Sequence, residues 1–349
     1  MLFDTPPDFL FARSGNTVGK TFLFEEAIHP KSAYAGYLIR YRPDPSKLTP
    51  HYLKQFCFSG KYENWVKSQI RAGAQPNINA KEYGSMEIPL PPIPEQQKIA
   101  KILSTWDNAI SITERLIDNS TQQKKALMQQ LLTGKKRLLD NEGKRFEGEW
   151  EEVTLEEAVK YRRGSFPQPY GNPEWVDEVN GYPFVQVYDI AKNMKLKPDT
   201  KIKISDAAID KSVFIPKETI IVSLQGSIGR VAITQYDAYV DRTILLFQEF
   251  LVPLNKMFFA YIIQELFEIE KTKAPGGTIK TITKAVLSNF KVLIPPLKEQ
   301  QKIATVLTNA DKEIELLEQQ LADLQQEKKS LMQVLLTGKV RVVVDGEVA

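Results

Sequence analysis

The sequence predicts a mixed α/β (α+β) fold, in which two globular domains of short strands and helices are separated by two long helices. Three observations predict it. A segment repeats at a fixed offset, each copy carries a heptad pattern, and β-branched and aromatic runs bounded by turn residues lie between the copies. The 349 residues, 42% apolar and 26% charged, are enough for two cored domains.

The composition excludes several classes of protein. One cysteine, Cys57, and two histidines cannot build a disulfide framework, nor a zinc site that needs about four such ligands. No run of 18 apolar residues could span a membrane, and MLFDTPPDFLF lacks the basic start of a signal peptide. We therefore expect a cytoplasmic protein. Its formal charge of +3 is too small to indicate nucleic acid by itself.

The repeat is the strongest signal in the chain. Residues 91–104, PPIPEQQKIAKILS, recur at 295–308 as PPLKEQQKIATVLT, an offset of 204. The same offset aligns LLTGK at 131–135 with LLTGK at 335–339. A gene duplication is the simplest explanation, because the alignment needs no gap from 88 to 138.

Each copy of the repeat predicts one long helix. Proline pairs just before each copy end an extended segment and permit a helix start, whereas Gly134 and Gly338 stand where a helix would end. Apolar residues spaced alternately by four and three form a seam over five heptads, so we expect the two helices to pack on each other. The seam includes Ile99, Leu103, Trp106, Ile110, Ile303, Leu307, Ile314, Leu317, Leu321, Leu324 and Leu331.

Two lysines occupy the same heptad position of the seam. Burial of Lys124 and Lys328 would be costly unless each reaches an edge or a carboxylate. One interpretation is that they fix the register of the helix pair. The other is that they mark a face left for a partner helix.

The segments between the helices predict the two domains. Strand-like runs at 182–190, 218–224, 230–234 and 238–248 precede a helical stretch at about 255–271. The first domain repeats only the later part of this pattern and lacks about 60 residues that correspond to 150–210. The predicted boundaries are 1–94 for the first domain, 95–134 for its helix, 135–149 for a linker, 150–296 for the second domain, 297–338 for its helix and 339–349 for a tail.

These motifs carry a family resemblance. PPIPEQQKIA and PPLKEQQKIA, the two LLTGK segments, WEEVTLEEAVKYRRGSFP at 150–167 and GYPFVQVYDI at 181–190 resemble the DNA-specificity (S) subunits of type I restriction-modification systems. The resemblance covers nearly the whole chain. It implies that each domain is a target-recognition domain for one half of a bipartite DNA site. It also implies that the helices form an antiparallel coiled coil, which docks two modification (methyltransferase) subunits.

The resemblance also implies what this chain lacks. Restriction subunits would be further partners, and S-adenosylmethionine and ATP would bind to partner subunits only, so this chain would be a non-catalytic subunit without a cofactor. An alternative is a truncated, partly non-functional specificity fragment that acts as a partner-binding scaffold or decoy. Three explanations of the short N-terminus stay open at this point: a genuine short start, a frameshift or the choice of start site.

Catalysis by this chain has weak support in the sequence. Residues 14–21 nearly spell the phosphate-binding motif GxxxxGK[ST], but Ser14 stands where its first glycine belongs. Residues 171–174, GNPE, differ from the Asn-Pro-Pro-aromatic motif of amino-methyltransferases. His29 and His51 lie far apart in sequence, and Cys57 lies in an apolar stretch typical of a core. We therefore predict no catalytic and no metal-binding residues.

DNA contacts would come from clustered charge, because neither domain is strongly basic. Residues 1–94 carry 11 Lys+Arg and 8 Asp+Glu, and residues 150–294 carry 18 of each. Three kinds of feature suit contacts with phosphates and base edges. They are arginine side chains beside a turn, glycine-rich loops, and polar residues that alternate on one strand face, as predicted for Gln186 and Tyr188. The predicted DNA-binding residues are Arg162, Arg163, Ser165, Gln186, Tyr188, Gln225, Ser227, Arg230, Lys273, Thr278 and Lys280, with Arg13, Asn16 and Lys20 in the first domain.

Overall fold

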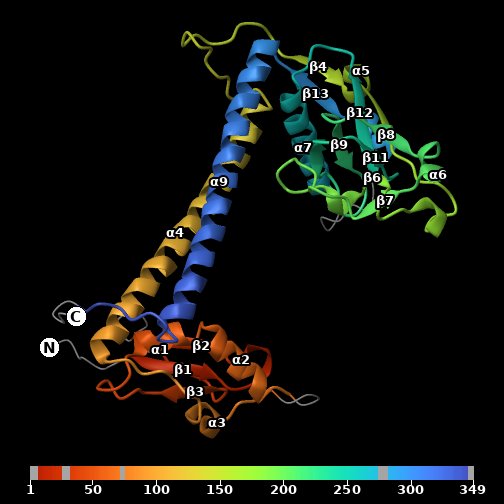
Figure 1. The fold of residues 1–349 in the computed structure, drawn as a ribbon. Coiled ribbons are helices and arrows are strands. Elements are labelled where there is room, and N and C mark those ends of the chain that lie inside the picture. The colour runs from red at the N-terminus through yellow and green to blue at the C-terminus, as the bar shows by residue number, and fades with distance from the viewer. Residues whose placement is uncertain (1–6, 26–31, 71–74, 274–281, 345–349) are drawn as a thin grey trace. The chain divides into compact units, whose positions relative to one another are not determined.

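The computed structural model describes residues 7–25, 32–70, 75–273 and 282–344, and its contacts divide the chain into two compact units (Figure 1). The first unit consists of residues 1–117 and 317–349, and the second of residues 118–316. Each unit contains one globular domain and the adjoining parts of the two long helices. None of the helices in the described part of the chain is long and apolar enough to cross a membrane.

The first domain is a small antiparallel sheet with short helices packed beside it. The strand order is β2-β1-β3. Short polar side chains begin the helices: Thr49 caps α1, Ser59 caps α2, and Asn79 forms a capping box with Glu82 at α3. The elements are β1 (Asp8–Ala12), a 3-10 turn (Gly15–Thr17), β2 (Thr21–Phe24), β3 (Leu38–Tyr41), α1 (Pro50–Phe56), α2 (Gly60–Gln69) and α3 (Ala80–Gly84).

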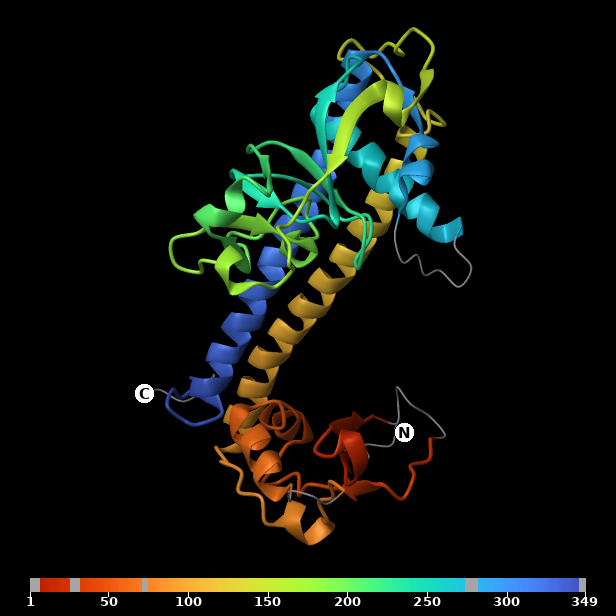
Figure 2. The ribbon, with the colours of Figure 1, turned by 90° about the vertical axis from the view of Figure 1, so that its right-hand side faces the viewer.

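The second domain, green and cyan in Figure 2, is larger. It contains three sheets, with orders β10-β9-β12-β5, β7-β6-β11-β8 and β13-β4. Helix α7 packs against the first of these sheets, and the apolar side chains between them form the main core. The elements are β4 (Glu151–Thr154), α5 (Leu155–Ala158), β5 (Val159–Arg163), β6 (Tyr182–Val185), β7 (Ile202–Ile204), α6 (Asp206–Ile209), β8 (Val213–Ile215), β9 (Ile220–Ser223), β10 (Val231–Ile233), β11 (Ala238–Val240), β12 (Ile244–Phe250), α7 (Lys256–Lys273), α8 (Lys284–Ser288) and β13 (Lys291–Ile294).

The two long helices are α4 (Ile93–Leu131) and α9 (Leu297–Leu335), of 39 residues each. Both end three residues before the predicted glycines. Gly134 and Gly338 instead adopt positive φ angles of 69° and 73° in the turn that follows, a conformation that favours glycine.

The predicted seam between these helices is confirmed. In the first unit the start of α4 packs against the end of α9, and in the second unit the end of α4 packs against the start of α9. The pair is therefore antiparallel, as in a coiled coil. Ile99, Leu103, Ile303 and Leu307 are buried, and the remaining seam positions are buried or half-buried.

Candidate functional site

Loops from four strand ends meet at one edge of the second domain. Ser165 N, after β5, donates to Val240 O at the end of β11, at 3.0 Å. Asp241 N, after β11, donates to Val185 O at the end of β6, at 3.1 Å. The Arg230 guanidinium, in the loop after β9, donates to Ile190 O at 3.2 Å. We call residues 162–172, 186–190, 224–230 and 241–243 the strand-end cluster.

The two arginines of β5 have different surroundings. Arg163 Nη2 donates to the backbone oxygen of Ile282 at 2.9 Å, and Ile282 N donates to Leu224 O at 3.3 Å. Arg163 therefore ties β5 to the loop after β9. Arg162 is exposed and, as the neighbouring residue on a strand, projects from the opposite face. Ser165 donates its hydroxyl to Lys211 O at 2.9 Å.

The prediction that Gln186 and Tyr188 alternate on a strand is wrong. Strand β6 ends at Val185, and a 3-10 turn follows at Val187–Asp189. The Asp189 carboxylate accepts from Gln186 N at 2.8 Å and from Lys201 N at 3.1 Å, which bends the chain. Burial raises the pKa of this carboxyl.

The turn nevertheless brings Gln186 and Tyr188 together. The Gln186 amide donates to the Tyr170 hydroxyl at 3.2 Å and accepts from the Tyr188 hydroxyl. Burial raises the pKa of Tyr188 to about 12, so this hydroxyl is protonated at neutral pH. Lys201 lies 5.1 Å from the centre of the Tyr188 ring, and Arg242 lies 5.4 Å from that of Tyr170. Tyr170 and Arg242 were not predicted, because each stands in a loop without a motif of its own.

Asp241 is a third residue of the strand-end cluster that the sequence did not predict. The residue is 2% exposed, and its Oδ1 accepts from the backbone N–H and the hydroxyl of Thr243, at 2.9 and 2.6 Å. Oδ2 has no hydrogen-bond partner among the described residues. The Asp241 carboxylate is therefore enclosed within the cluster, where its Oδ1 holds the turn after β11.

The glycine loop of the second domain lies beside the 3-10 turn. Gln225 and Ser227 are exposed. Gly226 lies against the turn, because a Cβ atom at this position would be 3.9 Å from the Val187 side chain. The loop therefore joins Arg230 and Gln186 in one cluster. Lys273 ends α7, but its side chain lies outside the described residues, as do Thr278 and Lys280.

The first domain repeats only the glycine loop of this cluster. Ile78 N donates to Arg13 O at 2.8 Å, as Ile282 N donates to Leu224 O in the second domain. Asn16 and Lys20 are exposed on the loop. Lys20 leads into strand β2 rather than a helix, so the loop lacks the helix N-terminus on which a phosphate-binding motif depends.

The histidines and the cysteine, which could in principle act in catalysis or metal binding, do not form a common site among the described residues. His51 contacts Glu25 at 3.1 Å, His29 lies outside the described residues, and Cys57 is a buried thiol whose pKa is raised by burial. In the described ranges no three His, Cys, Asp or Glu side chains are grouped as metal ligands would be.

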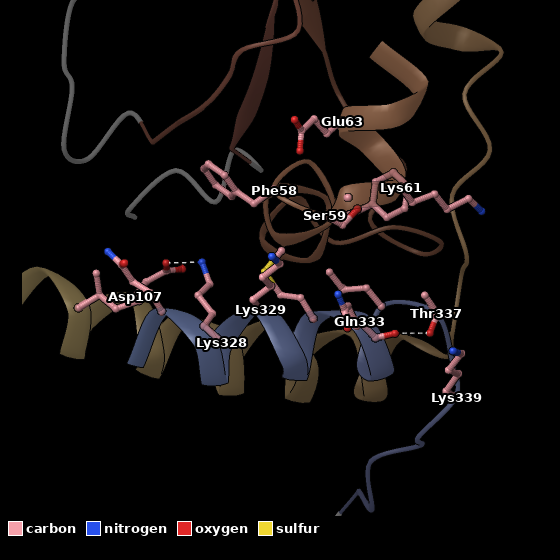
Figure 3. A pocket seen from close by; sticks show the side chains of 16 residues that line it. Phe58, Ser59, Lys61, Glu63, Asp107, Lys328, Lys329, Gln333, Thr337 and Lys339 are labelled. Carbon is pink, nitrogen blue, oxygen red and sulfur yellow. Dashed lines mark hydrogen bonds and ion pairs between the residues drawn. The ribbon is translucent and has the colours of Figure 1, made fainter. Parts of the chain in front are cut away.

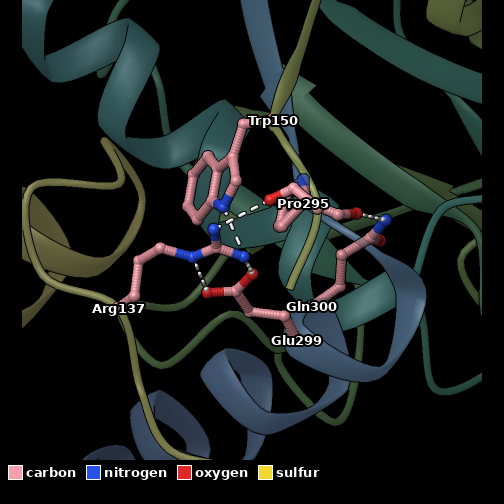
Figure 4. Close-up of polar contacts among 6 residues, drawn as sticks. Arg137, Trp150, Pro295, Glu299 and Gln300 are labelled. Atoms are coloured by element: carbon pink, nitrogen blue, oxygen red, sulfur yellow. Dashed lines mark hydrogen bonds and ion pairs between the residues drawn. The ribbon is translucent and has the colours of Figure 1, made fainter. Parts of the chain in front are cut away.

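The EQQ motif at the start of each long helix anchors that helix to its unit. Figure 4 shows Glu299 accepting from Arg137 Nε and Nη2, at 3.0 and 2.6 Å, and from Trp150 Nε1 at 3.2 Å. In the first unit, Glu95 is held in the same way by Arg341, at 2.7 and 2.6 Å. Arg137 and Arg341 are themselves related by the offset of 204.

The glutamine that follows this glutamate has a matching role in both units. Gln96 Nε2 donates to Pro91 O, and Gln300 Nε2 donates to Pro295 O, both at 2.9 Å. Their Oε1 atoms accept from the backbone just before the domain helix, at Thr49 and Asn255. The motif thus joins each helix start to its own domain.

The two seam lysines pair with aspartates of the opposite helix. Lys328 Nζ lies 2.5 Å from Asp107, and Lys124 Nζ lies 2.5 Å from Asp311. Each aspartate also accepts from its domain, from Gln55 at 2.8 Å and from Tyr261 at 2.5 Å. These contacts favour the interpretation that the lysines fix the register of the helix pair.

A basic hollow of about 680 Å³ lies in the first unit, between the start of α2 and the two long helices (Figure 3). Phe58, 58% exposed, stands at its edge, and Lys328 lies 5.4 Å from the centre of that ring. Lys61, Lys329 and Lys339 also line it. No sequence pattern predicted this hollow.

Comparison with known proteins gives consistent matches over both domains. Residues 2–120 and 147–326 match the family model of the type I restriction modification DNA specificity domain. The putative type I restriction enzyme MjaX specificity subunit of Methanocaldococcus jannaschii is 30% identical over 349 residues, which cover 96% of this chain and 79% of that protein. The MjaVIII specificity subunit of the same organism is 27% identical over equal shares. The solved S subunit of a type I restriction-modification system from M. genitalium has the same fold, with a TM-score of 0.57 at 14% identity over 95% of this chain and 83% of that chain.

Proposed function

The chain belongs to the family of type I restriction-modification DNA specificity subunits, and on this premise we propose that it is the DNA-recognition subunit of such a complex. It directs modification (methyltransferase) and restriction subunits to a bipartite DNA site. Methyl transfer from S-adenosylmethionine and the use of ATP belong to those partners, and this chain is non-catalytic. Its place with DNA and these partners is the cytoplasm.

The strand-end cluster of the second domain carries the proposal, because it combines the groups that read DNA. Arg162 and Arg242 are exposed guanidiniums, which suit phosphates and guanine edges. The Gln186 amide is held between two tyrosine hydroxyls, and a held amide suits an adenine edge.

Different residues of the cluster would orient the protein on DNA and read the base sequence. Arg163 is engaged with the backbone of Ile282, so its role is to hold the loops together. Phosphate contacts orient the protein without reading sequence, whereas contacts to base edges specify it. We assign Arg162 to the first class and Gln186 and Arg242 to the second.

A role as a partner-binding scaffold or decoy is not favoured. The family matches extend over both globular domains and both helices, and the two relatives are covered over 79% of their length. A decoy would need only the surface that contacts its partners.

The test uses the chain assembled with its methyltransferase partners and a DNA library read out by methylation. The Arg242→Ala and Gln186→Leu variants are expected to lose sequence preference by about 1–3 kcal/mol at single base positions. Lys291→Ala is the matched control, because Lys291, on β13, is an exposed cation paired with Glu152 of β4. Unchanged preference in both cluster variants would refute the site assignment.

A further inference from the structure

The first domain reproduces the register of the second domain's main sheet. Phe9 and Phe11 of β1 pair with Tyr41 and Ile39 of β3. Ile220 and Val222 of β9 pair with Phe247 and Leu245 of β12 in the same way. Strand β3 therefore corresponds to residues 244–247, and α3 corresponds at the offset of 204 to α8.

In the second domain a strand-helix-strand segment, Glu151–Arg163, covers this part of the sheet. Its strand β5 pairs with β12, with Tyr161 opposite Phe247, and its strand β4 pairs with β13. Leu155, Ala158 and Val159 between the strands are fully or almost fully buried in the core. Leu155 N also donates to Phe290 O at 2.8 Å.

In the first domain the same place is an open apolar groove. Among the described residues, β3 has a strand partner on its β1 side only. A hollow of about 140 Å³ is lined by β3, α3 and the segment after α3, which correspond to the elements that Leu155 and its neighbours cover in the second domain. Tyr41 and Leu90 are exposed. The lining residues are Phe11, Ile39, Tyr41, Leu53, Ala80, Tyr83, Gly84, Met86 and Ile88.

The opposite face of the first domain's sheet indicates that the missing part is a single segment rather than a whole second sheet. In the second domain that face carries Ile221 and Leu246, which are buried against the β7-β6-β11-β8 sheet. In the first domain Arg40 stands at the position of Leu246, with Asp8 2.9 Å away, and Asp8 also contacts Arg42 at 2.6 Å. Charges on this face disfavour a second apolar sheet, whereas the groove itself stays apolar.

We propose that the groove binds a short strand-helix-strand segment of another polypeptide, of the same type as Glu151–Arg163, which completes the first domain. The edge of β3 supplies main-chain hydrogen bonds to an added strand. The hollow selects apolar side chains with the spacing of Leu155, Ala158 and Val159. This interaction is independent of DNA recognition by the second domain, which lies in the other unit.

The test is binding of a labelled synthetic peptide of residues 149–164 to the full chain, measured by fluorescence anisotropy. We expect saturable binding, and binding at least about tenfold weaker for the same peptide with Leu155→Asp. Gly84→Leu in the chain fills the hollow in place of the peptide, and it should also weaken binding at least about tenfold. A Cβ at Gly84 meets nothing within 4 Å, so the variant should fold.

Gly60→Leu is the matched control, because a Cβ there is equally open but Gly60 lines the basic hollow instead. It should leave the affinity unchanged. Hydrogen exchange should slow at Arg40 when the peptide binds, because its amide faces away from β1 and toward the added strand. No saturation up to about 1 mM peptide, or equal affinity for the Gly84→Leu chain, would overturn the proposal.

Discussion

Arg137 and Glu299, 162 residues apart in sequence, form a two-bond ion pair at the point where α9 begins. The Glu299 carboxylate is buried, so removal of the guanidinium would leave a buried charge without its partner. Arg137→Ala is expected to lower the free energy of unfolding by about 3 kcal/mol. Urea denaturation followed by circular dichroism measures this change. Lys144→Ala, which removes an exposed partner of Glu142, is the control and should have an effect below about 1 kcal/mol.

The stability of the first unit depends on pH through the carboxylate of Glu95. Hydrogen bonds from Arg341 hold the pKa of Glu95 below its ordinary value of 4.5. The folded state thus binds fewer protons than the unfolded state near this pH. The contribution of the pair is complete above the ordinary pKa and disappears as the pH falls through the lowered one.

The expected result is a loss of stability on acidification that depends on this carboxylate. From about pH 5 downward, the free energy of unfolding of the native chain should fall more steeply than that of the Glu95→Gln variant. Glu87→Gln, at an exposed glutamate of the same unit, should follow the native curve. Parallel curves for all three proteins would contradict the assignment.

The helix seam can be tested by two leucines of α9 that differ in burial. Leu324 is half-buried on the seam, whereas Leu316 is 72% exposed. Leu324→Asp should destabilise the helix pair by about 2 kcal/mol and prevent assembly with the methyltransferase partners, as measured on a sizing column. Leu316→Asp should assemble normally. Normal assembly of the Leu324→Asp variant would count against the role of the seam.

The sequence predicted the repeating parts of this molecule because their signals are local. Heptad spacing and the proline and glycine boundaries placed both helices within three residues of their observed ends. Gln186 was misplaced because Asp189, only three residues away, bends the chain through its side chain. The position of Asp241 depends on the parallel pairing of β6 with β11, which joins segments more than 50 residues apart and leaves no local pattern.

Arg162 offers the sharpest test of how the second domain contacts DNA. It is exposed at the end of β5 and projects away from the Arg163 contact with Ile282, so we expect it to meet a phosphate. Arg162→Ala should weaken binding about equally for all DNA sequences and reduce the slope of log affinity against log salt by about 1. Arg163→Ala should instead lower stability, because its guanidinium holds the loops. The assembled complex should be titrated at several salt concentrations, with Lys291→Ala as the control. A salt slope that is unchanged in the Arg162→Ala variant would exclude a phosphate contact at this position.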